Sequence, residues 1–184
     1  MLKTYGIRLV IVATLAALSA CTGAPDGVRA VEGFKVESYL GQWYEIARLD
    51  HSFERDMIGV TAEYSLRDDG GLTVLNRGFK TDAQLWSDAE GKAFFVGKND
   101  TGHLKVSFFG PFYGSYIIFD VGREEEDYQY AFVSGMNTDY LWLLSRTPTV
   151  SDKLLSDFKL RATELGFDTT QLIIVDQSIH QKNR

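Results

Sequence analysis

Side chains of the types that carry out enzymatic chemistry are few in this 184-residue chain, and they are scattered along it. The three histidines are His51, His103 and His180. Only His51 has acidic residues close by, at Glu54 and Asp56. No Gly-x-Ser-x-Gly motif occurs, and no set of histidines and carboxylates has the spacing of a metal site. The sequence therefore predicts neither an enzyme nor a bound metal or cofactor.

The single cysteine, Cys21, stands at the end of a segment that is typical of a bacterial leader. Lys3 and Arg8 supply its basic part, and residues 7–18 form an apolar run that is shorter than the roughly 20 residues of a membrane-spanning helix. The stretch LSAC at 18–21 resembles the lipobox of bacterial lipoproteins, in which the cysteine becomes the new N-terminus and receives lipid. With Cys21 consumed in this way, no disulfide can form in the mature chain.

The lipobox resemblance implies a division of the chain and a location. Residues 1–20 would be the signal peptide, 21–33 the lipidated N-terminus with a short polar tether, and 34–184 a single domain. Thr22 follows the cysteine, whereas inner-membrane lipoproteins of enterobacteria carry Asp at that position. The expected location is therefore the outer membrane, with a lipid anchor and a periplasm-facing domain; the leaflet is left open.

The elements that must position the remaining side chains are short strands. The surplus of aromatic residues, 12 Phe, 9 Tyr and 3 Trp, favours β structure or a broad apolar cavity. Apolar and polar residues alternate over 58–67, and the turn DDGG precedes a return strand at 72–80. Six further strands bring the expected number to about eight, which predicts a closed up-and-down barrel or a sandwich. They lie at 92–96, 103–109, 113–121, 128–134 and 140–146, and in the run that starts at Trp43.

An amphipathic helix is expected after the last of these strands. Strands 113–121 and 128–134 are apolar on both faces, so one face can line a cavity while the helix covers the other. A last short strand at 172–175 is expected at the rim or edge. Ser151 is the expected N-cap of the helix and Gly166 the C-cap. The apolar residues at helical spacing are Leu154, Leu155, Phe158, Ala162 and Leu165.

Charge and surface pattern exclude two further classes of protein. The net charge is −6 and lysines and arginines form no cluster, so no nucleic-acid partner is expected. A barrel that spans a membrane carries an apolar band on the outward face of every strand. Here Glu63, Arg67 and Lys105 fall on outward faces, so the predicted barrel is not of that kind.

Two motifs at the ends of the predicted barrel resemble those of the lipocalin family. Gly41-Gln42-Trp43 resembles the G-x-W motif that opens the first strand, and Arg146 in LLSRTP resembles the basic motif that closes the last one. The resemblance implies that Arg146 lies across the Trp43 ring at the closed end of the barrel. A cation–π contact of this kind contributes about 0.5–2 kcal/mol.

The family's middle motif, Thr-Asp-Tyr, is assigned by its position before the seventh strand. That position holds Asp127 and Tyr128, while the same three letters occur in a turn at 138–140. Longer stretches such as WYEIARLDHSFER and LKVSFFGPF, together with the lipobox, resemble the bacterial lipocalins, outer-membrane lipoproteins related to apolipoprotein D. The resemblance implies an all-β fold, an eight-stranded antiparallel up-and-down lipocalin barrel with one C-terminal α-helix packed on its outside.

Alternation along strand 58–67, matched to the family's inward positions, predicts the residues that face the barrel interior. They combine small groups, aromatics and a few hydroxyls or amides, which suits a long apolar chain with a modest polar head. The expected ligand is an amphipathic lipid, either a fatty acid or a lysophospholipid. The predicted ligand-binding residues are Glu45, Ala62, Tyr64, Val74, Asn76, Leu104, Val106, Phe108, Tyr116, Ile118, Val133, Tyr140 and Trp142.

Two questions stay open at this level. Glu45 points inward by parity with Trp43, and a buried carboxylate must be hydrogen-bonded, paired or protonated. Its partner is either a ligand head group or a tyrosine hydroxyl. The alternative to a lipid carrier is a ligand-free envelope scaffold whose barrel is filled by side chains. The loops expected to frame the mouth are 50–58, 81–87 and 110–113, and in the first of them Phe53, Arg55 and Met57 are expected to form a lid.

Overall fold

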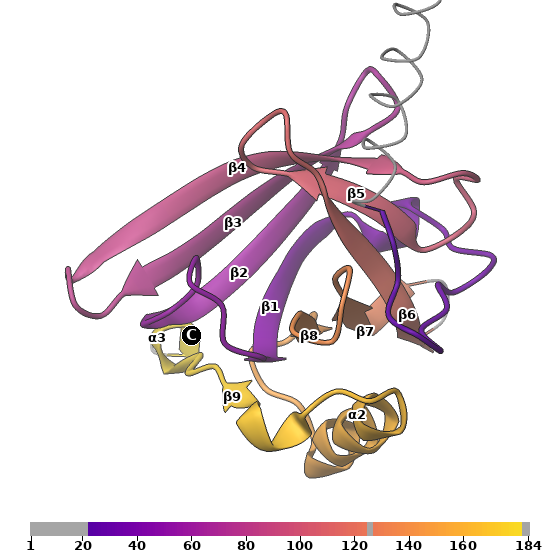
Figure 1. The fold of residues 1–184 in the computed structure, drawn as a ribbon. Coiled ribbons are helices and arrows are strands. Elements are labelled where there is room, and N and C mark those ends of the chain that lie inside the picture. Colours follow the sequence, from indigo (N-terminus) through magenta and orange to yellow (C-terminus); the bar gives the residue numbers. More distant parts are fainter. Residues whose placement is uncertain (1–21, 125–126, 182–184) are drawn as a thin grey trace, which may run out of the picture.

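The computed structural model describes residues 22–124 and 127–181, in which one antiparallel sheet closes into a barrel (Figure 1). The strands follow one another around the wall in chain order, and β1 pairs with both β8 and β2 to close it. The predicted eight-stranded up-and-down barrel is confirmed. Its strands are β1 (Gly41–Arg48), β2 (Met57–Leu66), β3 (Leu72–Lys80), β4 (Leu85–Phe95), β5 (His103–Ser107), β6 (Gly114–Glu124), β7 (Asp127–Ser134) and β8 (Leu141–Ser145).

Strand β4 is longer than the alternation pattern predicted. It begins at Leu85 rather than at residue 92, and it pairs with β3 from Leu72 opposite Ala93 to Lys80 opposite Leu85. The first half of β4 is exposed or only half-buried, so it carries no buried face that a sequence pattern could reveal. The backbone ladder with β3 holds that half in the sheet instead.

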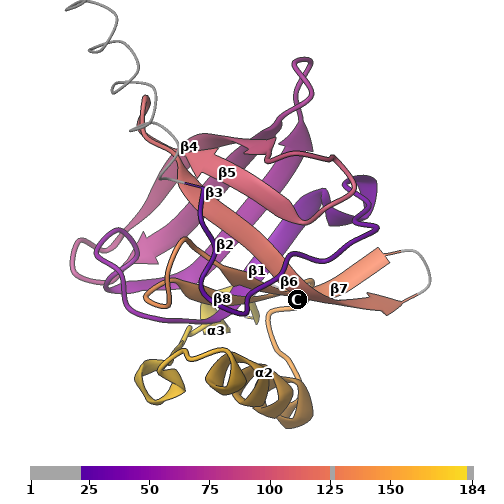
Figure 2. The same ribbon diagram turned by 45° about the vertical axis from the view of Figure 1, so that its right-hand side comes forward.

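Helix α2 (Asp152–Glu164) covers one outer face of the barrel (Figures 1 and 2). Ser151 caps it, because its Oγ accepts a hydrogen bond of 3.2 Å from the backbone N–H of Leu154, and Gly166 follows its end with a φ of +86°. The predicted helix, its N-cap and its covered face are confirmed. Its buried Phe158 and Ala162 pack in a cluster with the outward side chains Ile117, Phe119, Phe132, Leu141 and Leu143.

The chain after α2 closes a gap between the first two strands. It forms η2 (Thr169–Gln171), β9 (Ile173–Ile174) and α3 (Ser178–Gln181). Strands β1 and β2 pair only at the start of β1, and β9 pairs with the end of β1. Gln177 then joins the two strands, because its Nε2 donates to the backbone oxygens of Glu45 at 2.7 Å and Val60 at 2.9 Å. The expected last strand therefore lies at this seam.

The N-terminal segment, predicted to be a tether, lies along the wall at β5 and β6. Because β5 begins only at His103, the backbone oxygen of Ile118 on β6 is left to accept from the N–H of Val31 at 2.9 Å. Val28 is buried in the cluster beneath α2. The expectation that organised structure begins near Phe34 is therefore wrong, since hydrogen bonds and apolar contacts already hold the preceding residues.

The short helix η1 (Glu37–Tyr39) connects this segment to β1. The predicted signal peptide and Cys21 lie outside the described residues. Within 22–124 and 127–181, no helix has the length and hydropathy that are needed to cross a bilayer.

Candidate functional site

Trp43 and Arg146 meet at the end of the barrel where β1 starts. Arg146 Cζ lies 3.9 Å from the centroid of the Trp43 indole, and the indole N–H donates to the backbone oxygen of Tyr39 at 2.8 Å. Gly41 has a φ of +85°, and a Cβ there would lie 3.7 Å from Arg146 Nη1, so glycine suits this turn. The predicted stacking is confirmed. The guanidinium also donates to the backbone oxygens of Gln42 at 2.7 Å, Leu40 at 2.8 Å, Ser38 at 3.0 Å and Tyr128 at 3.2 Å.

Tyr128 completes this closed end. It is fully buried, its hydroxyl accepts from the backbone N–H of Lys35 at 2.9 Å, and its ring stacks on Phe34 with centroids 5.6 Å apart. Asp127 is exposed at the start of β7. The motif assigned by position thus lies with the other two motifs, whereas residues 138–140 lie in the turn before β8.

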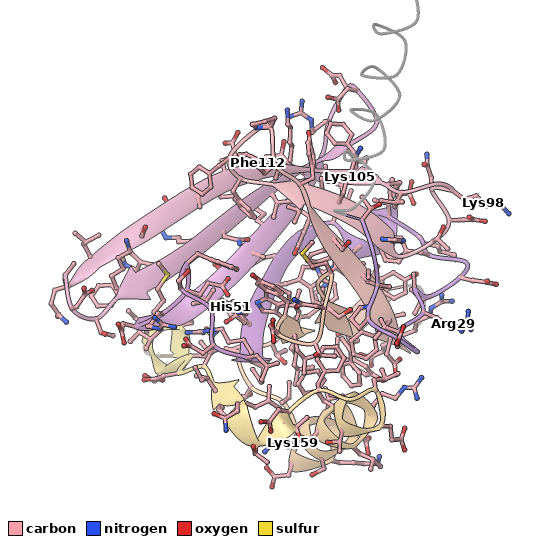
Figure 3. The ribbon with its side chains drawn as sticks, viewed as in Figure 1. Arg29, His51, Lys98, Lys105, Phe112 and Lys159 are labelled. Atoms are coloured by element: carbon pink, nitrogen blue, oxygen red, sulfur yellow. The ribbon has the colours of Figure 1, made fainter. Side chains whose placement is uncertain are left out.

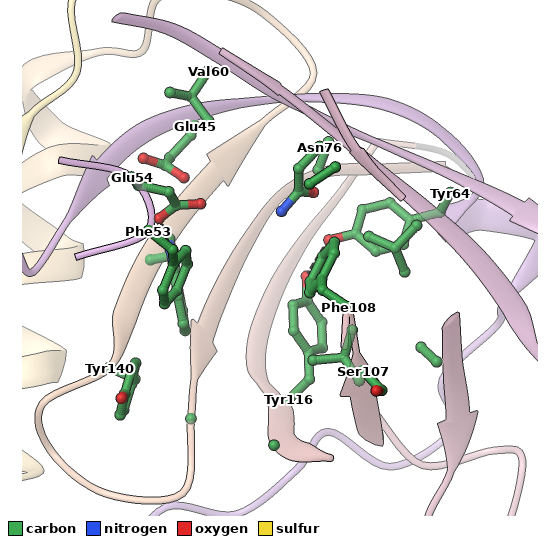
Figure 4. A pocket seen from close by; sticks show the side chains of 18 of the residues that line it. Glu45, Phe53, Glu54, Val60, Tyr64, Asn76, Ser107, Phe108, Tyr116 and Tyr140 are labelled. Carbon is green, nitrogen blue, oxygen red and sulfur yellow. Dashed lines mark hydrogen bonds between the residues drawn. The ribbon is translucent and has the colours of Figure 1, made fainter. Parts of the chain in front are cut away.

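Beyond the closed end, the barrel encloses a cavity of about 720 Å³ (Figure 4). Most of the sequence-predicted ligand-binding residues line it, although contact with a ligand stays a prediction. Those that line it are Glu45, Ala62, Tyr64, Val74, Asn76, Leu104, Val106, Phe108, Tyr116, Tyr140 and Trp142.

Two predicted residues, Ile118 and Val133, do not line the cavity. They are partners across β6 and β7, and both are fully buried in the inner core cluster that contains Trp43. Trp142 on β8, which is the strand partner of Val133 on β7, lines the cavity instead. Inward parity was right for both residues, but both are fully buried and neither lines the cavity, so direct contact with a ligand is not expected.

Several lining residues escaped the sequence reasoning because they lie outside the regular strands. Glu54 comes from the loop between β1 and β2, whereas Phe53 and Met57, which were predicted as part of the lid, also line the cavity. Phe109 and Phe112 come from the loop between β5 and β6, and Tyr39 comes from η1. Strand alternation does not predict which side chains of a loop point inward, so only the residue types could have indicated that these positions line the cavity.

Three tyrosine hydroxyls form a polar cluster in the lower part of the cavity. The hydroxyl of Tyr116 lies 2.6 Å from that of Tyr39 and 2.7 Å from that of Tyr64. Tyr39 also packs on Trp43, with ring centroids 4.8 Å apart, so the cluster adjoins the floor. Burial raises the pKa of Tyr64 to about 12 and raises the pKa values of Tyr39 and Tyr116 well above their ordinary value, so all three hydroxyls are neutral hydrogen-bonding groups.

A pair of buried carboxyls, Glu45 and Glu54, forms one wall of the cavity (Figure 4). Arg48 Nη1 donates to Glu45 Oε1 at 2.8 Å, and Arg48 Nη2 donates to the backbone oxygen of Glu54 at 2.7 Å. Glu54 Oε2 accepts from the indole N–H of Trp142 at 3.2 Å and lies 3.1 Å from His51 Nε2. Glu45 is therefore paired with an arginine rather than with a tyrosine hydroxyl.

Burial controls the protonation of this wall. It raises the pKa of Glu45 well above its ordinary value, and the nearby Glu54 raises it further, while Arg48 opposes the shift. Burial also raises the pKa of Glu54, while the hydrogen bond from Trp142 and the charge of Arg48 oppose that shift. His51 stays neutral, because burial and Arg48 lower its pKa to about 4. The carboxyl pair therefore holds a proton at pH values where isolated glutamates are ionised.

Two further polar atoms in the cavity wall are buried without a hydrogen-bond partner. They are Asn76 Oδ1 on β3 and Ser107 Oγ at the end of β5. Buried polar atoms are usually satisfied, so unsatisfied ones in a cavity wall are available to a ligand. Within the described residues, no group of three or more His, Cys, Asp or Glu side chains could hold a metal ion.

The barrel, its arginine-capped floor and its apolar cavity define a small-ligand binding protein of the lipocalin class. A lipocalin-like domain matches residues 34–177, and the chain belongs to the lipocalin family. It is 58% identical over 160 residues to the outer membrane lipoprotein Blc of Vibrio cholerae, which covers 87% of this chain and 92% of that protein. This similarity places it among the outer-membrane lipoproteins of the family.

More distant relatives share the fold. Apolipoprotein D of Rattus norvegicus is 30% identical over 181 residues, covering 92% of this chain and 95% of that protein. The crystal structure of lobster apocrustacyanin A1 superposes with a TM-score of 0.63 at 19% identity, covering 85% of this chain and 91% of that one. The predicted relation to apolipoprotein D is confirmed.

Proposed function

We propose that this lipocalin binds one amphipathic lipid, a fatty acid or a lysophospholipid, and stores or carries it at the outer membrane. The cavity is the observation that supports the proposal. Its volume of about 720 Å³ lies within the range of about 300–1,000 Å³ that is usual for ligand sites, and most of its lining residues are apolar or aromatic. Apolar surface that leaves water would drive binding, at about 25 cal/mol per Å² before the cost of ordering the ligand.

The polar groups of the wall are placed to select the head group. Glu45 and Glu54 stand on one side of the cavity, and Figure 4 shows the amide nitrogen of Asn76 directed toward them. A head group that lies between them meets acceptors on one side and an amide on the other. The carboxyl pair would favour a head group that donates hydrogen bonds or carries positive charge over a free carboxylate.

We also propose that acyl chains on Cys21 anchor the protein in the membrane and that its domain faces the periplasm. Each buried CH₂ contributes about 0.8 kcal/mol, so two or more chains hold the domain firmly at a bilayer. The scaffold alternative requires a barrel filled by side chains, and the cavity favours the carrier over it. Capture and release need no bond to be made or broken, so no catalysis is proposed.

The test uses the chain from residue 22 onward, delipidated and titrated with a fluorescent fatty acid and with a lysophospholipid. Trp142 lies in the cavity wall, so its emission should change as the ligand binds. We expect saturable one-to-one binding that unlabelled lipid competes. Val106→Phe, which fills the cavity, should weaken binding, while Leu160→Phe on exposed α2 should not. A well-folded protein without saturable binding would restore the scaffold alternative.

A further inference from the structure

The loop between β5 and β6 presents two aromatic side chains to solvent. Phe109 is 80% exposed and Phe112 is 77% exposed, more than any other large hydrophobic side chain in the described ranges. Single exposed apolar residues are ordinary, but two aromatic rings at one loop tip are typical of a surface that meets an apolar partner. Both rings also line the mouth of the cavity, so whatever covers them lies at the cavity entrance.

The described N-terminus is held on the same hairpin. Ser115 on β6 donates from its Oγ to the backbone oxygen of Gly23 at 2.7 Å. Cys21 precedes Gly23 by two residues, and consecutive Cα atoms are about 3.8 Å apart. Acyl chains on Cys21 would therefore leave the protein from the outer surface of the β5–β6 hairpin.

The anchor point and the aromatic tip lie close together. Phe112 precedes Ser115 by three residues, which spans about 10 Å of extended chain. Lys105 pairs with Ser115 across the hairpin, and its Nζ lies 5.2 Å from the centroid of the Tyr113 ring. Figure 3 shows Phe112 and Lys105 on one side of the barrel and Lys159 of α2 on the opposite side. Aromatic rings beside a lysine match the interface between acyl chains and phosphates.

We propose that the tip of the β5–β6 hairpin docks on the bilayer that holds the anchor, with Phe109 and Phe112 in the interfacial layer. This inference rests on the proposed acylation of Cys21. The bilayer is the occupant because the anchor brings it to this hairpin. Docking would place one edge of the cavity mouth against the membrane, so a lipid could exchange between bilayer and cavity without crossing bulk water.

The test places a nitroxide label on the loop of the mature, acylated protein. Because Cys21 is the only cysteine and is blocked by acylation, Phe112→Cys is labelled at that position alone. Leu160→Cys is the matched control, since Leu160 is 64% exposed on α2. Mass spectrometry first establishes acylation of Cys21. Collision rates with oxygen and with a water-soluble nickel complex are then measured on vesicles of phosphatidylcholine and phosphatidylglycerol.

We expect the nickel collision rate at position 112 to fall several-fold on the vesicles while the oxygen rate stays high, with an aqueous profile at 160. Phe109→Cys should behave like Phe112→Cys, which guards against a local folding defect. An aqueous profile at 109 and 112 in the acylated protein would overturn docking but leave the anchor intact. Loss of both collision rates with spin–spin broadening would show a second copy on the loop and also overturn it. An unacylated Cys21 would remove the anchor and the docking together.

Discussion

The two ends of the barrel differ in how their buried polar groups are hydrogen-bonded. At the closed end, Arg146 stacks on Trp43 and donates to four backbone carbonyls, so four of the five N–H groups of the cation that seals the floor are hydrogen-bonded. Toward the mouth, the buried carboxyls of Glu45 and Glu54 have raised pKa values, and Ser107 Oγ has no partner. Satisfied polar groups stabilise a fold, whereas unsatisfied ones near a cavity lower stability and leave bonding capacity for a ligand.

This difference assigns separate tasks to the two regions. Changes at the closed end should alter stability without altering which lipid is bound. Changes in the cavity wall should alter affinity or its pH dependence, with smaller effects on stability. Each substitution below tests one side of that division.

The largest effect is expected for Trp43→Ala. The indole is fully buried, so its removal leaves a cavity and abolishes the stacking with Arg146. We expect the free energy of unfolding in urea to fall by about 3–5 kcal/mol. The folded fraction should keep its order of preference among lipids. Loss of binding with unchanged stability would show that Trp43 belongs to the ligand site rather than to the floor.

The next largest effect is expected for His51, on how the stability of the fold depends on pH. In the folded protein, burial and Arg48 lower the pKa of His51 from 6.5 to about 4, so the ring contributes stability above pH 6.5 that is lost as pH falls toward 4. At about 1.4 kcal/mol per pKa unit, the loss reaches at most about 3.5 kcal/mol. Glu45 and Glu54 act with the opposite sign, because their raised pKa values favour the folded state at low pH.

The matched variant His51→Gln separates these contributions. It keeps a hydrogen-bonding group beside Glu54 but removes the titration of the ring. Urea unfolding of both proteins above pH 6.5 and near pH 4 should show the wild type losing its advantage at the lower pH. Parallel stability curves would mean that His51 is protonated as readily in the folded chain as in the unfolded one.

A smaller effect is expected for Glu54→Gln on ligand choice. Glu54 lines the cavity, so its carboxyl can meet a head group directly. We expect an alkylammonium to bind about tenfold more weakly to the variant, a loss of about 1.4 kcal/mol, and a fatty acid of equal chain length to bind as well or better. In the wild type, fatty-acid affinity should rise as pH falls, because binding a carboxylate beside the pair takes up a proton. Equal losses for both ligands would place the head group elsewhere.

The smallest effect is expected for Ser107→Ala. This change removes a buried hydroxyl that has no partner, so the free protein should gain up to about 1 kcal/mol, while affinity for a ligand that uses the hydroxyl should fall. Ser134→Ala is the matched control, because its Oγ is also buried without a partner but does not line the cavity. It should show the gain in stability without the loss in affinity. Identical behaviour of the two variants would remove Ser107 from the site.

The comparison of the two ends also explains what could be predicted from the sequence. The closed end was predictable because its residues sit at strand ends with a fixed order in the chain, as with Gly41, Trp43 and Arg146. The cavity wall was predictable wherever alternation determines the inward side, as for Tyr64 and Val74. Ile118 and Val133 point inward but do not line the cavity, because inward direction alone does not show whether a buried side chain reaches the cavity surface.

The sequence by itself determined the order of strands, the inward faces, the helix with its caps and the lipobox. These features depend on local periodicity and on residues close together in the chain. Only the tertiary structure decided that Glu54 lines the same cavity as Glu45, that Gln177 bridges β1 and β2, and that Gly23 is held on the β5–β6 hairpin. Loops and termini have no repeating pattern, so their partners are set by how the closed barrel brings distant backbone and side-chain groups together.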